Sequence, residues 1–285
     1  MKKGIRIFTD YLLFGNIYIA ACAVSIALST FLFLHKEPDI LLLCFIFFLT
    51  IISYDLHAYF NPLLVQSSVR MSWIRVNKST LLISMIVAFA AACYCFFLLH
   101  HLFSWFLLLT LLTLIYSLPR IFPPLNDYLI FIQKIKVFYL SMIWLMVTVF
   151  TPIISSGSKI DFFAILGISS TYFLILLVCL IFDERDKNQL SYEQRASILK
   201  KLNNQKTSMF FHSVLMLAVG STIIKEILYP DLYIFTANLI AQIAVLLVFI
   251  TRKTDRTDYW YYLLVDGILL IPGLMLFLLK MSSTS

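Results

Sequence analysis

Two carboxylates stand three residues apart, at Asp183 and Asp186, where a long apolar segment ends. If the helix runs on for one more turn, this spacing puts both side chains on one face, and two carboxylates on one face can share a divalent cation. Arg185 lies between them, and arginine can bond two phosphate oxygens at once. The pattern predicts a site for a phosphorylated ligand held by metal and cations. The plainer interpretation, a membrane helix that ends in charged residues, stays open.

Another acid, Asp55, lies several residues inside the apparent end of an apolar segment. An ionisable group at that depth is costly unless it faces a bundle interior, a partner or water. Asp55 is therefore expected either to line a functional cavity or to follow a helix that leaves the membrane at Ser53. The loop after it carries Arg70 beside Trp73. Arg70 is either an interface residue near an aromatic anchor or a cation that reaches a diphosphate.

Two more charges fall within apolar segments. Lys136 sits one turn into a segment and either points into a ligand site or snorkels to the interface. Asp266 lies near the middle of the last segment, where an unpaired carboxylate is expensive. We expect Asp266 to make a structural hydrogen bond between helices, with a ligand role as the alternative. The helix-breaking Pro272-Gly273 suits a kink nearby.

The composition is that of a polytopic membrane protein. The chain has 285 residues, 61% of them hydrophobic and only 13% charged, which is too little polar surface for a soluble domain of this length. A basic soluble face for nucleic acid is missing. The five cysteines all fall in apolar segments without metal-ligand spacing and are expected to be packing residues. With only 7 glycines, a glycine-rich phosphate loop is disfavoured.

About 20 apolar residues cross a bilayer, which predicts an all-α bundle of about nine transmembrane helices in one domain, residues 1–285. The basic N-terminus and the apolar run after it are expected to form a retained first helix. All but four of the 22 lysines and arginines lie at the N-terminus or in alternate, longer loops. The positive-inside rule therefore puts the N-terminus and those loops in the cytoplasm and the C-terminus outside. The predicted spans are 12–34, 40–60, 81–99, 102–118, 135–154, 162–182, 209–228, 232–250 and 259–279.

Taken together, this pattern resembles the UbiA-type intramembrane prenyltransferase superfamily, in particular its divergent bacterial members of the kind found in Bacteroidetes. The resemblance covers almost the whole chain and rests on order and spacing. Its parts are the spans, the charged loops after the second and sixth of them, Tyr116-Ser117-Leu118-Pro119, Lys136 with Trp144 to Thr148 and Pro152, Asp183-Glu184-Arg185-Asp186, and Asp266-Gly267.

The resemblance implies a function and a site. Members transfer a prenyl group from an isoprenoid diphosphate to a lipophilic acceptor, with Mg²⁺ held by two aspartate-rich motifs. Asp183 and Asp186 match the second motif, and Asp55 is the one acid where the first, usually Asn-Asp-x-x-Asp-x-x-x-Asp, should stand. These three aspartates are thus the expected metal ligands and catalytic residues. The cations expected to stabilise the leaving diphosphate, in a cytoplasm-facing cavity of the bacterial inner membrane, are Arg70, Arg120, Lys136 and Arg185.

Two alternatives follow from the differences between this sequence and the family's aspartate-rich motifs. Because one carboxylate stands where several are usual, the chain is either an active enzyme with reduced metal ligation or a family member without the reaction. The second case predicts a lipid-binding or assembly protein of the membrane. A small-solute transporter coupled through Asp266 is a weaker alternative, since the charges cluster at one face of the membrane instead of its midplane. The sequence identifies no protein partner.

Overall fold

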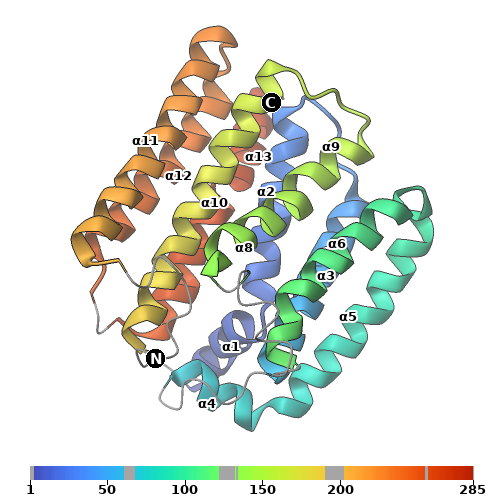
Figure 1. The fold of residues 1–285 in the computed structure, drawn as a ribbon. Helices are drawn as coiled ribbons and strands as arrows, with labels where there is room; N and C mark the ends of the chain where they lie inside the picture. The colour runs from blue at the N-terminus through green and yellow to red at the C-terminus, as the bar shows by residue number, and fades with distance from the viewer. Residues whose placement is uncertain are drawn as a thin grey trace.

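The fold is an all-helical bundle, seen in a computed structural model (Figure 1). The structure describes residues 3–60, 68–121, 132, 134–189, 202–253 and 256–284, and these contain no β-strand. Apolar segments of this length take up helix because each backbone N–H and C=O must find its partner within the segment when lipid surrounds it. The predicted fold class is therefore confirmed at the level of an all-α protein.

The helices follow the apolar segments of the sequence closely. α1 and α2 correspond to the first predicted span, α3 to the second, α5 to the third and α6 to the fourth. The fifth is divided among α8, η3 and α9, and the ninth among η6, η7 and α13. The bounds are α1 Lys3–Phe14, α2 Ile17–Phe33, α3 Ile40–Phe60, α4 Val69–Val76, α5 Lys78–Leu98, η1 His100–Leu102, α6 Phe103–Ile121, α8 Lys136–Leu145, η3 Met146–Phe150, α9 Thr151–Ser155, α10 Phe162–Gln189, α11 Asn204–Leu228, α12 Leu232–Thr251, η6 Trp260–Val265, η7 Ile268–Leu270 and α13 Ile271–Thr284.

Seven helices of the described chain are long and apolar enough to cross a membrane, or eight when α1 and α2 count as one span bent by 54°. The predicted fourth span is a shorter apolar helix over His100–Tyr116. All nine predicted segments are thus helical, but the count of nine crossings stays a prediction. The outer faces of α5 and α11 carry large exposed apolar side chains such as Ile86, Phe97 and Met216, which suits contact with lipid.

Polar residues before the apolar runs set where several helices begin. Each such side chain accepts a hydrogen bond from a backbone N–H of the first turn, which helix geometry otherwise leaves without a partner. The pairs are Asp39 with Leu42 N (3.1 Å), Ser68 with Met71 N (3.1 Å), Asp161 with Ala164 N (2.8 Å), Asn203 with Lys206 N (2.8 Å) and Asp231 with Ile234 N (3.0 Å).

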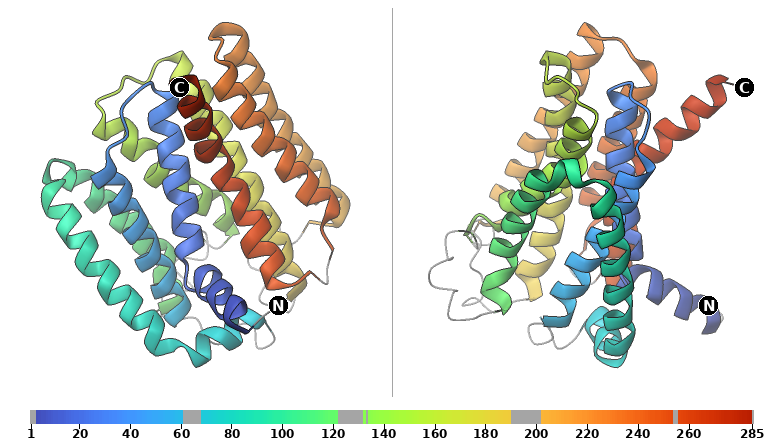
Figure 2. Two further views of the ribbon diagram at one scale, coloured as in Figure 1. Left: turned by 180° about the vertical axis from the view of Figure 1, so that it is seen from behind. Right: turned by 90° about the vertical axis from the view of Figure 1, so that its right-hand side faces the viewer.

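Helix α2 runs through the centre of the bundle and packs against α3, α13, η3 and η7. The two chain ends lie at opposite ends of the bundle (Figure 1). Figure 2 shows α1 and the C-terminal part of α13 leaning out from the bundle on the same side. α1 leaves the line of α2 at Asn16, whose backbone is left-handed (φ 60°), a conformation that asparagine tolerates better than most residues.

An aromatic cluster fixes α1 against the elements that carry the site. Phe14 is fully buried, with its ring 6.0 Å from Trp73 of α4, 5.2 Å from Tyr259 and 6.1 Å from Tyr262 of η6. Asp10 accepts a hydrogen bond from the Tyr259 hydroxyl. The first helix thereby sets the positions of α4 and η6, which both face the cavity described next.

Candidate functional site: a charged cavity among the helices

A cavity of about 400 Å³ lies among the helices and combines two chemically different surfaces. Apolar side chains form most of its wall, and charged side chains gather where α4, α8, α10 and η6 meet. The apolar residues include Leu49, Val137, Leu140, Ile143, Val147, Ile175, Val178 and Leu269. The ionisable residues include His57, Arg70, Lys136, Asp183, Arg185, Asp186, Asp258 and Asp266.

Both carboxylates of the Asp-x-x-Asp pair line this cavity. Helix α10 continues to Gln189, so Asp183 and Asp186 lie on one face as the spacing predicted. Asp186 is bound by two cations: its Oδ1 is 3.0 Å from Arg185 Nη2 and its Oδ2 is 3.5 Å from Lys136 Nζ. Most of the charge of Asp186 is therefore balanced by the protein's own cations.

Arg185 lies on a platform of aromatic rings. Its guanidinium carbon is 5.0 Å from the ring centre of Phe182 and 5.3 Å from that of Tyr262. Cation–π contact and the ion pair with Asp186 together hold the side chain in one orientation. Of its nitrogens, the buried Nη1 makes no hydrogen bond to any described residue. One hydrogen-bond donor of Arg185 is therefore unused by the described part of the protein.

Arg70 reaches the cavity from the short helix α4. Asp258 holds the start of this helix, because its Oδ2 accepts a 2.9 Å hydrogen bond from the Arg70 backbone N–H. The Arg70 side chain donates to the Tyr262 hydroxyl (2.8 Å) and to Asn16 Oδ1 (3.0 Å). Tyr262 is thus in contact with both Arg70 and Arg185 and sets them at one side of the cavity.

Asp55 has a different place from the one expected. It is buried, with 1% of its surface exposed, and it is not among the residues that line the cavity. Its Oδ1 accepts a 2.7 Å hydrogen bond from Asn16 Nδ2, and Asn16 in turn accepts from Arg70. Asp55 therefore acts on the cavity through Asn16 and Arg70. The pairing became possible because the bend between α1 and α2 brings Asn16 next to α3.

The three aspartates expected to bind Mg²⁺ do not come together around one point of the cavity. Asp55 lies behind Asn16, and Asp186 is paired with Arg185 and Lys136. Within the described segments, no three His, Cys, Asp or Glu side chains are placed to share a metal ion. Arg120 belongs to the end of α6, and its side chain lies outside the part of the chain that the structure describes.

Several aromatic residues of the cavity were given no role in the site by the sequence. Tyr54 and Trp144 meet edge to face, with the Trp144 indole donating to the Tyr54 hydroxyl (3.2 Å). His57 stacks on Tyr116 at 5.7 Å between ring centres. In an apolar chain rich in aromatic residues, these rings look like ordinary packing. Asn16 and Asp258 were the more visible omissions, because a polar residue at a helix boundary predicts a cap or a tertiary contact.

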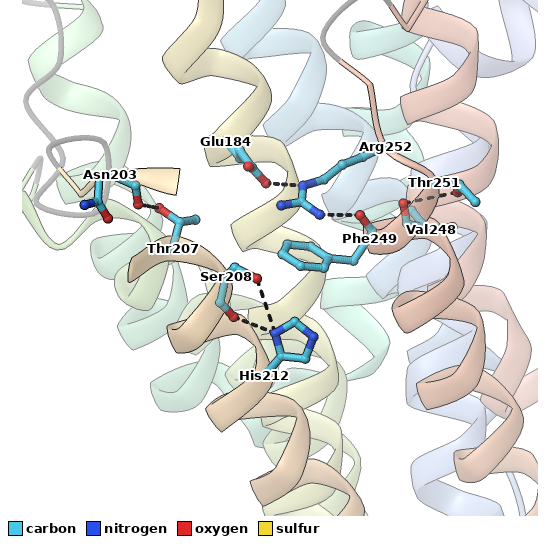
Figure 3. A network of polar contacts seen from close by, with 9 residues as sticks. All are labelled: Glu184, Asn203, Thr207, Ser208, His212, Val248, Phe249, Thr251 and Arg252. Carbon is cyan, nitrogen blue, oxygen red and sulfur yellow. Dashed lines mark hydrogen bonds and ion pairs between the residues drawn. The ribbon is translucent and has the colours of Figure 1, made fainter. Parts of the chain in front are cut away.

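A second polar network lies beside the cavity and has a structural character (Figure 3). Arg252 Nε donates to Glu184 Oε2 (2.8 Å), and its guanidinium lies 3.3 Å from the ring centre of Phe249. Phe249 is itself stacked on Phe211 of α11 at 3.5 Å. None of these residues lines the cavity. The network ties α10, α11 and α12 together at the end of the bundle where α10 carries its acids.

Comparison with known proteins gave no match among protein-family models, curated sequences or solved structures. The interpretation of the cavity therefore rests on its geometry and on the chemistry of its lining residues.

Proposed function

We propose that this protein is a UbiA-like membrane prenyltransferase that binds an isoprenoid diphosphate in the charged cavity. The observation that carries the proposal is that one cavity is lined both by three cations, Arg70, Lys136 and Arg185, and by many apolar side chains. A prenyl diphosphate has the same two parts, a strongly anionic head and an apolar tail. A volume of about 400 Å³ is within the usual range for small-molecule pockets, about 300–1,000 Å³.

The cations suit the head group. Arg70 and Arg185 present planar guanidinium groups, which can each bond two phosphate oxygens, and Lys136 adds a compact charge. Both arginines are held by contacts with Tyr262, so little side-chain freedom is left to lose on binding. When the bond between the prenyl C1 and the diphosphate oxygen breaks, the same three groups balance the charge that develops on the leaving diphosphate.

The described residues do not make a complete Mg²⁺ site. Of the three expected ligands, Asp183 lines the cavity, Asp186 is shared by two cations and Asp55 lies outside. Mg²⁺ binding stays a prediction of the family resemblance. The location in a bacterial inner membrane, with the charged end of the cavity toward the cytoplasm, is likewise part of the proposal and is supported by the sorting of lysine and arginine among the loops.

One observation favours a second function, binding of a prenyl lipid without transfer. The pairing of Asp186 with Arg185 and Lys136 makes the acid–cation cluster self-balancing. Such a cluster can hold an anionic head group but contributes less to its departure. The protein would then be a lipid-binding or assembly component of the membrane.

The test uses purified protein in lipid nanodiscs with farnesyl diphosphate, and with farnesol as the control that lacks the head group. Arg70→Gln and Arg185→Gln each remove hydrogen bonds to a charged group, worth about 1.5–3 kcal/mol, so the affinity for farnesyl diphosphate should fall roughly 10- to 100-fold. Arg6→Gln is the matched control, because the Arg6 side chain is 64% exposed and lies outside the cavity. Farnesol binding should change little in all three.

Transfer is measured on the same samples by release of inorganic diphosphate and by labelled prenyl groups in an added membrane lipid extract. Release that is lost in Asp183→Ala and Asp186→Ala supports the enzyme. Tight binding without release in the wild-type protein supports the second function. Equal affinity for farnesyl diphosphate in the wild type and both cavity arginine variants would contradict both functions.

A further inference from the structure

Among the described acids that line the cavity, Asp266 is the one to which the proposed function gives no role. It is buried, with 6% of its surface exposed, and it lines the cavity. Its carboxylate makes no hydrogen bond or ion pair with any residue that the structure describes; the hydrogen bond from Cys22 Sγ goes to its backbone carbonyl instead. The structural bond between helices that the sequence predicted for Asp266 is thus made by the backbone, and the side chain keeps its acceptor oxygens.

The backbone around Asp266 is irregular and is held by hydrogen bonds from side chains of α2. A π-helical stretch, Trp260–Val265, precedes it, and a 3₁₀ turn, Ile268–Leu270, follows. Three side chains on one face of α2 bond to carbonyls of this segment: Tyr18 Oη to Leu263 (3.0 Å), Cys22 to Asp266 (3.2 Å) and Ser25 Oγ to Leu270 (2.7 Å). Such π-helical interruptions occur frequently at functional sites.

Helix α2 packs closely against the segment that carries Asp266. A Cβ at Gly267 would lie 2.6 Å from the Tyr18 hydroxyl, and one at Gly273 would collide with the Ser25 carbonyl oxygen. Helix α2 therefore occupies the face on which Gly267 and Gly273 lie, and the carboxylate of Asp266 lies on the cavity side. Asp266 follows Tyr262 by four residues, so it lies about one helical turn further along this segment than the ring that holds the two arginines.

An ionisable side chain at this depth is costly unless a partner is present. The cations Arg70 and Arg185 act on Asp266 only at a distance, and neither makes an ion pair with it. Two other residues of the cavity wall that interact electrostatically with Asp266 are Tyr54 of α3 and Cys179 of α10, which carry a hydroxyl and a thiol. A buried acceptor that opens into a cavity, with no protein donor on it, is suited to a donor on a ligand.

We infer that Asp266 binds the hydrogen-bond donor, a hydroxyl or an amine, of a second lipophilic ligand in the inner part of the cavity. This rests on the proposed function in one respect: there, the second ligand is the acceptor of the prenyl group. The carbon–oxygen bond to diphosphate breaks with its electron pair on the leaving diphosphate. A bond forms between C1 and the acceptor heteroatom, and the heteroatom's proton passes to the Asp266 carboxylate, which becomes a carboxylic acid.

The first test needs no variant. Wild-type protein in nanodiscs is treated with N,N′-dicyclohexylcarbodiimide, an apolar reagent for carboxyl groups, and the modified peptides are identified by mass spectrometry. We expect label on Asp266, with protection by dodecanol or dodecylamine and none by dodecane. Stronger protection by one of the two probes tells which donor the site takes. No label on Asp266, or equal protection by dodecane, would overturn the inference.

The second test measures affinity. Asp266→Asn replaces a charged acceptor with a neutral one, which lowers the hydrogen-bond energy by about 1 kcal/mol, so the preferred probe should bind about fivefold more weakly. Asp231→Asn is the matched control, because Asp231 caps the start of α12 and does not line the cavity. Unchanged probe affinity in Asp266→Asn, with the fold verified by circular dichroism, contradicts the inference.

Farnesyl diphosphate binding separates this inference from the proposed function. Asp266→Asn should retain that binding, because the cations Arg70, Lys136 and Arg185 are unchanged. If Arg70→Gln retains it as well, the proposed function fails while the donor site at Asp266 stands. If Asp266→Asn keeps full affinity for both probes while Arg70→Gln loses farnesyl diphosphate, only the inference at Asp266 fails.

Discussion

The hydrogen-bonded series Asp55–Asn16–Arg70 gives a prediction that distinguishes a metal ligand from a positioning residue. Asp55→Asn keeps the size of the side chain, and its amide oxygen can still accept from Asn16 Nδ2, now 2.7 Å from the carboxylate. A hydrogen bond to a charged group contributes about 1.5–3 kcal/mol and one between neutral groups about 0.5–1.5 kcal/mol. The expected loss is therefore about 1 kcal/mol, or about fivefold in the affinity for farnesyl diphosphate.

The direction of this change is diagnostic. Removing a negative charge near the cavity would by itself strengthen the binding of an anion. Weaker binding would therefore show that Asn16 no longer holds Arg70 in position. Asp55→Leu should have the larger effect, because it leaves the buried Asn16 amide without an acceptor at a cost of about 1–3 kcal/mol. Both variants are compared by equilibrium binding in nanodiscs, with and without Mg²⁺.

A double-mutant cycle with Arg70→Gln completes the test. If Asp55 acts through Arg70, the Asp55→Asn penalty should vanish once Arg70 is replaced, since the supported group is gone. The same penalty in both backgrounds would refute the positioning role. A penalty that appears only when Mg²⁺ is present would restore Asp55 as a metal ligand.

Three further predictions concern the fold. Gly273→Ala should destabilise the protein by about 1–3 kcal/mol, because the new Cβ would collide with the Ser25 backbone. Gly220→Ala is the control and should be neutral or stabilising, because nothing lies within 4 Å of that position. Similar melting temperatures for the two variants in detergent would contradict the packing described for α2 and α13. Arg252→Lys should lower the free energy of unfolding by about 1 kcal/mol, since lysine keeps the charge near Glu184 but loses the planar contact with Phe249 (Figure 3). Arg6→Lys, at an exposed position, is its control. Equal melting temperatures for the two variants would contradict a stabilising role of the network. The topology is tested in cells on a background from which the exposed Cys44 and Cys93 have been removed. A membrane-impermeant maleimide added outside should label Lys159→Cys but not Lys253→Cys. The reverse labelling would show that the protein has the opposite orientation.

Much of the bundle could be predicted from the sequence, because a segment surrounded by lipid must satisfy its backbone hydrogen bonds internally. An apolar run of about 20 residues has to be helical, and Asp39, Asp161 and Asp231 mark where helices begin. The same local rules placed Asp183 and Asp186 on one helix face. They did not show that the first span bends by 54° at Asn16, because a left-handed residue there is favoured only by the packing of Phe14 on α4 and η6.

The site, too, could be predicted from the sequence only in part. The types of its residues were visible in sequence: two close carboxylates, Arg70, Lys136 and Arg185, and an isolated Asp266. Their partners were not, because each pairing joins residues far apart in the chain: Asp55 with Asn16, Arg70 with Tyr262, Lys136 with Asp186. Sequence alone determined a membrane bundle with acids and cations at the ends of its helices. Only the tertiary structure decided which charges neutralise one another and which face the cavity, since a side chain's partner is set by the packing of helices and not by its neighbours in sequence.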